Sequence, residues 1–251
     1  MIGQQWVVYI RRLQQRSCSK GYEPGILILN AIDHIVIGAA TLEEGVDFVQ
    51  RHLGVHIPFG GVHKTMGTHN HLMQLGESAF LEVIAVNPDI AAPDHARWYG
   101  LDDPFVRAQL DSEPRLLTWV VNTPDMHSLF DNAGESFGEP VKATRGNLSW
   151  LFGLPADGRL LAGGLLPYVI EWHCDEHPAS LMADTNCTLK SIEIDHPNPH
   201  WLRSRLQLID ASELVKVNNA ASPVLKVSIE SPVGLVELHS IQVEKSNQRY
   251  V

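Results

Sequence analysis

The sequence predicts an α+β fold built from repeated βαβββ modules, two of them paired around a cleft and a third at the C-terminal end. The first observation is that a glutamate occurs three times inside a strand-like apolar run, at Glu82, Glu171 and Glu237. The second is that each run closes a similar block of strand, helix and further strands. β-branched and aromatic residues favour strands. A carboxylate there is costly unless it is paired or bound to a cation, so the pattern indicates an internal repeat with a conditional metal site.

Length and composition describe an ordinary globular protein. The chain has 251 residues, 44% hydrophobic and 19% charged, enough for one large domain or two small ones. The net charge of −10 argues against nucleic acid or an anionic membrane as partner. No apolar run approaches the roughly 20 residues that span a bilayer. The three cysteines predict reduced thiols in a cytoplasmic protein.

The N-terminal segment differs from the rest of the chain. Residues 11–20 are basic in an otherwise acidic sequence. They fit a targeting peptide, translated sequence upstream of the true start, or a disordered tail. We therefore expect residues 1–30 to lie outside the fold, residues 31–182 to form the paired modules, and residues 183–251 to form the third, shorter module.

The first module is expected to begin with a strand over residues 31–37. Thr41 caps the following helix, and Glu44 three residues on completes a capping box. Leu42, Val46, Val49 and Leu53 give the helix an apolar stripe, and Gly54 ends it. Glycine-containing turns then separate three strands, expected over residues 56–64, 69–75 and 79–86.

The second module follows an irregular connection over about residues 87–114. Thr123-Pro124 marks its helix start, because a cap residue followed by proline favours the first helical turn. The strands of this module are expected over residues 116–121, 139–144, 147–154 and 166–174. The third module has a strand over 189–194, a helix over 198–208, and strands over 213–217, 224–230 and 234–241.

These blocks resemble a known superfamily. Asp33-His34-Ile35-Val36 opening a βαβββ unit, with Glu82 on its last strand, resembles the vicinal oxygen chelate superfamily of glyoxalases, extradiol dioxygenases and fosfomycin-resistance proteins. The resemblance covers residues 31–182, and 189–241 more weakly. It implies two modules facing each other around a cleft that binds a small molecule. The runs similar to its glyoxalase-like domain branch are residues 60–64, 67–70, 80–82 and 166–172.

The resemblance also implies a set of metal ligands. It places His34, Glu82 and Glu171 on metal-ligand positions, and Thr118 on the fourth position, where many metal-binding members carry histidine. One imidazole and two carboxylates can hold a divalent Zn, Mn, Fe or Ni ion, whereas a threonine hydroxyl is a poor ligand. A bound divalent metal and a metal-free site therefore both stay open. Without a metal, Glu82 and Glu171 would hydrogen-bond to each other, to His34 or to an arginine.

Further side chains are candidates for substrate contact. His69 and His71 alternate along one strand face, and His173 shares a face with Glu171. Asn70 and Trp150 are two further candidates for substrate contact. Asn70 could instead serve in a turn, and Trp150 could instead pack in the core. Module three has Ser191 where module one has His34. We therefore expect Glu237 to be structural, either packed against the other modules or in a homodimer contact.

Two functions compete. The first is a metal-dependent enzyme, a glyoxalase-type lyase or isomerase or a dioxygenase, in which the ion binds two vicinal oxygens of the substrate and Glu171 acts as base. The second is a metal-free protein that binds or sequesters a small apolar or aromatic molecule. Thr118 favours the second, and His34 with the two glutamates favours the first. A structural or regulatory member of the fold is a third alternative.

Overall fold

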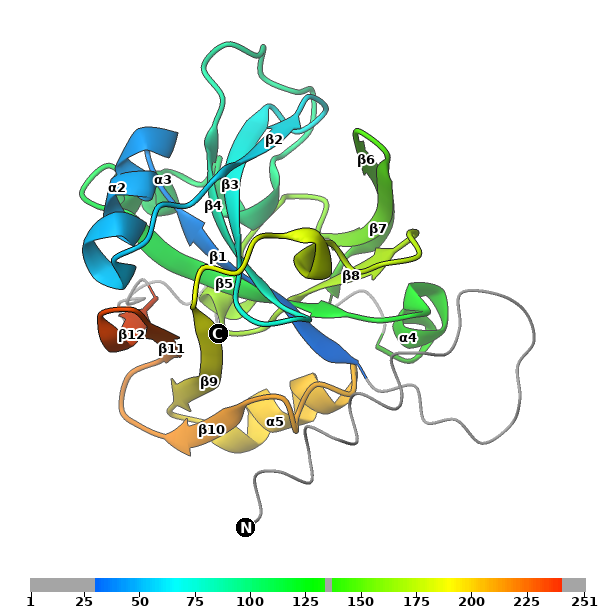
Figure 1. The fold of residues 1–251 in the computed structure, drawn as a ribbon. Coiled ribbons are helices and arrows are strands. Elements are labelled where there is room, and N and C mark those ends of the chain that lie inside the picture. Colours follow the sequence, from blue (N-terminus) through cyan, green and yellow to red (C-terminus); the bar gives the residue numbers. More distant parts are fainter. Residues whose placement is uncertain (1–29, 134–136, 241–251) are drawn as a thin grey trace.

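The first two modules together form one curved sheet of eight strands in the computed structural model, which describes residues 30–133 and 137–240 (Figure 1). The strand order is β2-β3-β4-β1-β5-β8-β7-β6. Module one comprises β1 (Ala31–Gly38), α2 (Leu42–Leu53), β2 (Phe59–His63), β3 (Thr68–Gln74) and β4 (Phe80–Val86). Module two comprises β5 (Arg115–Asn122), α4 (Met126–Ala133), β6 (Glu139–Arg145), β7 (Leu148–Leu154) and β8 (Tyr168–Trp172). The predicted α+β fold and the element order of both modules are confirmed.

The two modules meet at the centre of the sheet with an approximate twofold symmetry. Strands β1 and β5 are antiparallel neighbours, and each has the last strand of its own module beside it in parallel. Each of these central strands also contains a register irregularity. Asp33 is the extra residue in β1, and Leu117 is the extra residue in β5. The repeat seen in the sequence is therefore a repeat of strand pairing and of β-bulges.

The third module keeps the element order but not the pairing. It contains β9 (Thr188–His196), α5 (Pro199–Gln207), β10 (Lys216–Asn219), β11 (Val224–Ser231) and β12 (Gly234–His239). In its four-stranded sheet the order is β10-β9-β11-β12, so the first strand pairs in parallel with the second rather than with the last. It is thus a βαβββ segment with a topology of its own. The expected N-terminal extension, up to residue 29, and residues 241–251 lie outside the described part.

The capping box at the start of α2 forms as predicted. The Thr41 hydroxyl accepts a hydrogen bond from the Glu44 backbone N–H at 3.3 Å, and the Glu44 carboxylate accepts one from the Thr41 N–H at 3.2 Å. Gly54 ends the helix in the left-handed conformation, with φ 72°, which glycine adopts without a Cβ penalty.

Replacing Thr41 by alanine should lower the free energy of unfolding by about 1 kcal/mol, because one orphan N–H of the first turn loses its acceptor. Urea denaturation measures this. Glu43→Gln, in the same turn, serves as control and should cost only about 0.3 kcal/mol through the helix dipole. Equal effects of the two substitutions would contradict the role of the cap.

The two faces of the eight-stranded sheet bury different cores. The convex face packs against α2, α4 and the third module through alternate strand residues such as Ile35, Ile37 and Val169. The concave face holds a second cluster that includes Val36, Val120 and Ile170. Among the described helices, none combines the length and the apolar character that crossing a membrane would require.

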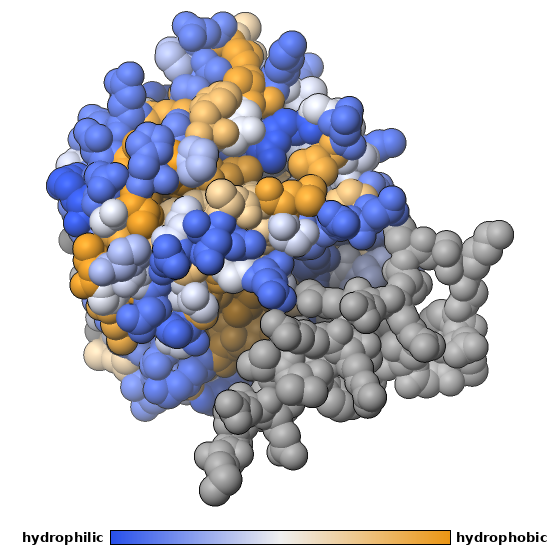
Figure 2. All heavy atoms as spheres, viewed as in Figure 1, coloured by the Kyte–Doolittle hydropathy of each residue, from blue (hydrophilic) through white to orange (hydrophobic). Residues whose placement is uncertain are grey.

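The connection between the modules fills part of the concave face. It contains the 3₁₀ helix η1 (Trp98–Gly100) and the helix α3 (Pro104–Leu110), which the sequence reading left irregular. Trp98, Tyr99 and Leu110 are buried in the concave cluster. Two further 3₁₀ helices flank β8, η3 (Leu161–Gly164) before it and η4 (Pro178–Leu181) after it. In the view of Figure 1, apolar residues gather on the surface between the β2–β3 and β6–β7 arms (Figure 2).

Candidate functional site

A narrow pocket opens in the concave face of the eight-stranded sheet, with a cavity volume of about 30 Å³. Its walls are largely aromatic and its floor is polar. The floor comes from module one and the upper wall from module two and the connection between the modules. The pocket is lined by His34, His63, Asn70, Leu72, Phe80, Glu82, Trp98, Tyr99, Arg145, Trp150, Phe152, Ile170 and Trp172.

The bulge in β1 organises the polar floor. Successive strand residues normally point to opposite faces, but the extra residue Asp33 lets its carboxylate reach the His34 side chain. The Asp33 Oδ1 lies 2.5 Å from His34 Nδ1. Both side chains are almost completely buried. A bulge that re-aims a side chain next to a pocket is typical of functional sites.

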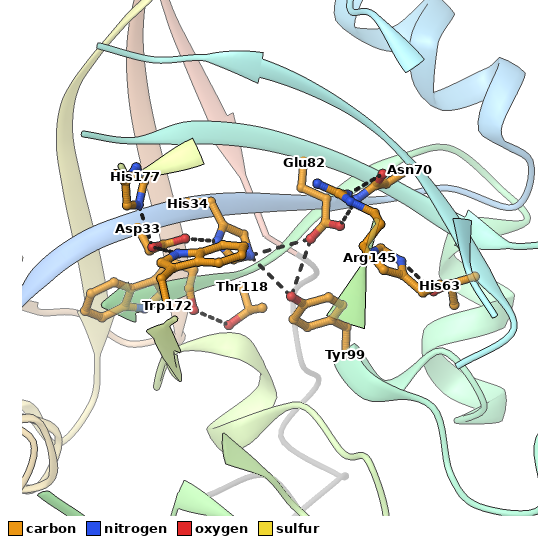
Figure 3. Close-up of polar contacts among 12 residues, drawn as sticks. Asp33, His34, His63, Asn70, Glu82, Tyr99, Thr118, Arg145, Trp172 and His177 are labelled. Carbon is orange, nitrogen blue, oxygen red and sulfur yellow. Dashed lines mark hydrogen bonds and ion pairs between the residues drawn. The ribbon is translucent and has the colours of Figure 1, made fainter. Parts of the chain in front are cut away.

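His34 lies between two carboxylates (Figure 3). Its Nδ1 faces Asp33, and its Nε2 lies 3.5 Å from Glu82 Oε2. The Tyr99 hydroxyl is 3.3 Å from His34 Nε2 and donates to Glu82 Oε2 at 3.4 Å. The result is a continuous buried chain of Asp33, His34, Tyr99 and Glu82.

The electrostatics of this chain favour a charged imidazole. Burial by itself lowers the pKa of His34, but its bonds to Asp33 and Glu82 outweigh burial and raise that pKa to about 9. Burial likewise raises the pKa of both carboxyls, and the histidine contacts override it. His177 and His34 lower the pKa of Asp33 to about 2, and His34 lowers that of Glu82 to about 2. At neutral pH the chain therefore carries two negative charges around one positive charge.

Tyr99 is held in a strained backbone conformation. Its φ of 59° and ψ of 21° lie in the left-handed region, which is an outlier for a bulky residue. Its backbone N–H donates to the Tyr168 hydroxyl at 3.2 Å, which fixes the turn. Burial, together with the charge of Glu82, raises the pKa of Tyr99 well above its usual value, so its hydroxyl stays protonated and remains a donor.

Asn70 of the floor and Arg145 of the wall continue the polar contacts beyond Glu82. The Asn70 amide donates to Glu82 Oε1 at 2.6 Å, and its own oxygen accepts from Arg145 Nη1 at 3.2 Å. Arg145 stands at the end of β6 and reaches across to module one. A Cβ on Gly61 would lie 2.8 Å from Arg145 Cδ, so the glycine gives this side chain its room.

His63 lies beside the same wall but stays neutral. Burial lowers its pKa to about 4, despite the attraction of Glu82, and the charges of Arg145 and His34 act in the same direction as burial. Its ring packs edge-on against Trp98 at 4.9 Å between centroids. Its Nδ1 is 3.2 Å from the Thr68 hydroxyl.

The other oxygen of Asp33 leads toward the surface. Asp33 Oδ2 accepts from Trp172 Nε1 at 2.7 Å and lies 2.8 Å from His177 Nε2. The His177 side chain is 18% exposed. Asp33 thus joins a partly exposed histidine to the buried imidazole of His34, and every oxygen of the carboxylate has a partner.

The structure does not bring Glu171 to the site, which corrects the sequence prediction. In β8 the pocket side chains are Ile170 and Trp172, so the glutamate between them points to the opposite, convex face. There its Oε2 accepts from the Met126 N–H at the start of α4, and its Oε1 lies 2.9 Å from His173 Nε2. Glu82 and Glu171 therefore open onto different faces of the sheet.

The symmetry of the two modules identifies the residue that stands where Glu171 was expected. Val36 in β1 pairs with Glu82, and Val120, its counterpart in β5, pairs with Tyr168. Tyr168 is buried and donates to the Arg159 carbonyl at 2.7 Å. The counterpart of the bulged Asp33 is the apolar Leu117. The Asp33-His34-Glu82 arrangement of module one is therefore replaced in module two by the uncharged Leu117, Thr118 and Tyr168.

Thr118 occupies the counterpart of His34 but turns away from the pocket. Its hydroxyl donates to the Gly164 carbonyl at 3.2 Å and to the Leu166 carbonyl at 3.4 Å. Gly164 has φ 93°, and a Cβ there would lie 1.9 Å from the Leu117 carbonyl oxygen. The segment around η3 therefore covers this half of the symmetric site with backbone.

The remaining predicted contacts divide by the strand alternation. Asn70 and Trp150 lie in the pocket. His69 and His71 flank Asn70 in β3 and face the other side, where His71 Nδ1 lies 2.6 Å from the Ile57 carbonyl. His173 is with Glu171 on the convex side. The sequence reading missed Asp33, Tyr99 and Arg145 as members of the site.

The side chains present do not fit the predicted metal site. Within residues 30–133 and 137–240, no three His, Cys, Asp or Glu side chains converge as metal ligands. Catalytic divalent sites usually draw three ligands from the protein. His34 and Glu82 supply two, and the counterparts in module two, Thr118 and Tyr168, are both engaged with backbone carbonyls.

Comparisons with known proteins give one family and several structural neighbours. A family model described as a glyoxalase-like domain matches residues 32–209. A hypothetical protein from Staphylococcus aureus is 14% identical with a TM-score of 0.54, covering 84% of this chain and 85% of its own. Methylmalonyl-CoA epimerase from Mycobacterium tuberculosis is 18% identical with a TM-score of 0.38, covering 60% of this chain and 92% of its own. A mutant of 4-hydroxymandelate synthase from Streptomyces coelicolor is 15% identical with a TM-score of 0.41, covering 85% of this chain and 63% of its own. The search of curated proteins found no match.

Proposed function

The chain belongs to the glyoxalase-like domain family of the vicinal oxygen chelate superfamily, and from this premise we propose that its concave pocket binds a small carbonyl compound and moves a proton on it. The proton-transfer groups are Glu82 and His34, with Tyr99 as the hydroxyl between them. The reaction class is an isomerisation or a lyase-type elimination that begins with loss of a proton beside a carbonyl group.

One observation carries this proposal, the buried imidazole between two carboxylates at the bottom of a pocket. Isolated buried charges are costly, and strongly shifted pKa values concentrate at functional sites. His34 with a pKa of about 9 is an acid at neutral pH, and Glu82 beside it is ionised. An acid and a base 3.5 Å apart can act on two neighbouring atoms of one substrate.

The Glu82 carboxylate takes a proton from the carbon next to the carbonyl, and the C–H electron pair forms a C=C bond. The carbonyl π pair moves to oxygen, which receives the proton of His34. His34 thereby loses the positive charge that holds the pKa of Glu82 low, so the carboxylate gains basicity in the same step. The reverse transfer returns the proton to the same carbon and gives exchange. Where that carbon carries a hydroxyl, the intermediate is an enediol, and protonation of the neighbouring carbon with loss of the hydroxyl proton gives an isomer.

The sequence also suggested metal-dependent catalysis and binding without turnover. A divalent metal held by His34, Glu82 and Glu171 does not fit the site, because the Glu171 side chain lies on the convex face and accepts from the Met126 N–H. Binding or sequestering without turnover is the second candidate. Thr118 and Tyr168 favour it, because half of the symmetric site is filled with uncharged side chains bonded to backbone.

Deuterium incorporation tests the proposed reaction. The protein is treated with a chelator and incubated in D₂O with a panel of carbonyl compounds such as phenylpyruvate, pyruvate and phenylacetaldehyde. Mass spectrometry and NMR then follow exchange at the carbon beside the carbonyl. Glu82→Gln should reduce catalysed exchange at least about 100-fold, as expected for loss of a general base.

Glu171→Gln is the matched control and should exchange like the wild type. Its amide oxygen still accepts the Met126 N–H. If Glu171→Gln abolished exchange while Glu82→Gln did not, Glu171 would be the base, as the sequence predicted. Saturable binding with no exchange in the wild type would leave the binding protein as the better description.

A further inference from the structure

Arg145 is a half-buried cation in the pocket wall without an ion-pair partner among residues 30–133 and 137–240. Its one hydrogen bond within that part of the chain is the 3.2 Å contact with the neutral Asn70 oxygen. Burial lowers the pKa of Arg145, opposed by the more distant charge of Glu82. A guanidinium presents five donors, so most donors of Arg145 have no acceptor among the described residues.

Trp98 supplies a second open donor in the same wall. Trp98 is only 4% exposed, and its Nε1 has no acceptor within the described part of the chain. A buried N–H without an acceptor costs free energy, about 1–3 kcal/mol. The His63 ring contacts both Trp98 and Trp150, at 4.9 and 6.4 Å between centroids. Arg145 lines the same pocket as these three rings, so the groups border one space.

The charges of the site sum to zero once Asp33 is counted beside His34, but Arg145 is not in ion-pair contact with either carboxylate. His34 and Arg145 are cationic, Glu82 is anionic and His63 is neutral. Glu82 is already bonded to Asn70 and faces His34. Arg145 is thus the cation that a ligand could pair with, and the flat rings of Trp98, Trp150 and Phe152 line the same pocket.

We propose that Arg145 and Trp98 form the carboxylate-binding end of the pocket, and that the ligand is a small planar or aromatic carboxylate. The planar fork of arginine matches a carboxylate through two parallel hydrogen bonds. Trp98, whose Nε1 lacks an acceptor among the described residues, lines the same pocket. The aromatic rings then cover the apolar body of the ligand. This inference rests on the proposed function for its site but not for the reaction.

Fluorescence titration tests the assignment, because Trp98, Trp150 and Trp172 line the pocket and report on its occupancy. The probes are benzoate, phenylacetate and phenylpyruvate, each paired with its neutral amide. At least one carboxylate should bind saturably, and its amide at least tenfold more weakly. Arg145→Gln should raise the Kd of that carboxylate at least tenfold and remove the preference for it over the amide.

Lys142→Gln is the matched control, because Lys142 is exposed in the same strand and the substitution likewise removes one positive charge. It should leave the Kd unchanged. Trp98→Phe keeps a ring but removes the donor, and should weaken the carboxylate about fivefold. Equal binding of acid and amide, an unchanged Kd in Arg145→Gln, or no binding by any of the carboxylates overturns the inference. Carboxylate binding through Arg145 without deuterium exchange keeps it and overturns the proposed reaction instead.

Discussion

Raising the pH from 6.5 to 9 should reduce the free energy of unfolding by about 3 kcal/mol, through His34 alone. The folded pKa of about 9 lies above the unfolded value of 6.5. The folded protein therefore keeps a proton that the unfolded chain has already released. The stabilisation is complete below pH 6.5 and is lost as the pH rises through about 9.

The acid side of the profile has a different origin. The pKa of His63 is lowered to about 4 by burial, so protons bind the unfolded chain first as the pH falls from 6.5. Stability should decline in this range by a further 3 kcal/mol or so. His69 and His196, whose pKa values burial also lowers, act in the same direction. Asp33 and Glu82 lose their contribution as the pH falls from about 4 toward 2. Maximum stability is therefore expected near pH 6.5.

Urea denaturation at a series of pH values measures both limbs. His34→Gln should be less stable at pH 6.5 but lose the alkaline limb, and His63→Gln should keep the alkaline limb and flatten the acid one. The two variants thus act as controls for each other. An alkaline limb of full size in His34→Gln would assign it to other groups and contradict a protonated His34.

The periodicity of the sequence predicted nearly every element because local rules determine them here. The capping box at Thr41 and the alternating strands agree with the folded chain. The predicted cap at Thr123 is wrong, because α4 begins at Met126 and Asp125 accepts from the Ser128 N–H of its first turn. The pairing of the third module was beyond such rules. Its β9 and β10 are parallel and adjacent, and the order of elements alone does not distinguish this from pairing of the first strand with the last.

Glu171 was assigned to the pocket because its apolar run resembles that of Glu82, and the strand register was not known from the sequence. The glutamates of β4 and β8 sit in similar apolar runs, but the strand pairing aligns Glu82 with Tyr168. The offset from Tyr168 to Glu171 is three residues, an odd number, and an odd offset moves a side chain to the opposite face of a strand. A sequence pattern that tolerates such an offset cannot assign a face.

The missed residues escaped for two other physical reasons. Asp33 joins the site only because a bulge interrupts the alternation of β1, and the sequence carries no glycine or proline there to mark it. Tyr99 lies in the connection between the modules, in a left-handed conformation that few bulky residues adopt. Arg145 comes from the end of β6, in the other module, and meets Asn70 only through the curvature of the sheet.

Asp33→Asn should lower the free energy of unfolding by about 3–5 kcal/mol, the range observed when one partner of a buried ion pair is removed. Asp33 is fully buried and accepts from His34, His177 and Trp172. An amide supplies one acceptor oxygen and turns its NH₂ group toward another donor. The imidazolium of His34 then loses the nearer of its two carboxylate partners.

The same substitution has a signature that a simple loss of packing does not produce. Because Asp33 raises the pKa of His34, Asp33→Asn should move the alkaline limb of the stability profile to lower pH. Asp157→Asn is the control. Its carboxylate forms an exposed ion pair with Arg159 at 2.9 Å, and such a pair contributes less than about 1 kcal/mol, so the alkaline limb should stay in place. If Asp33→Asn destabilised the protein without moving that limb, Asp33 would act in packing and hydrogen bonding, and the charge on His34 would depend on Glu82.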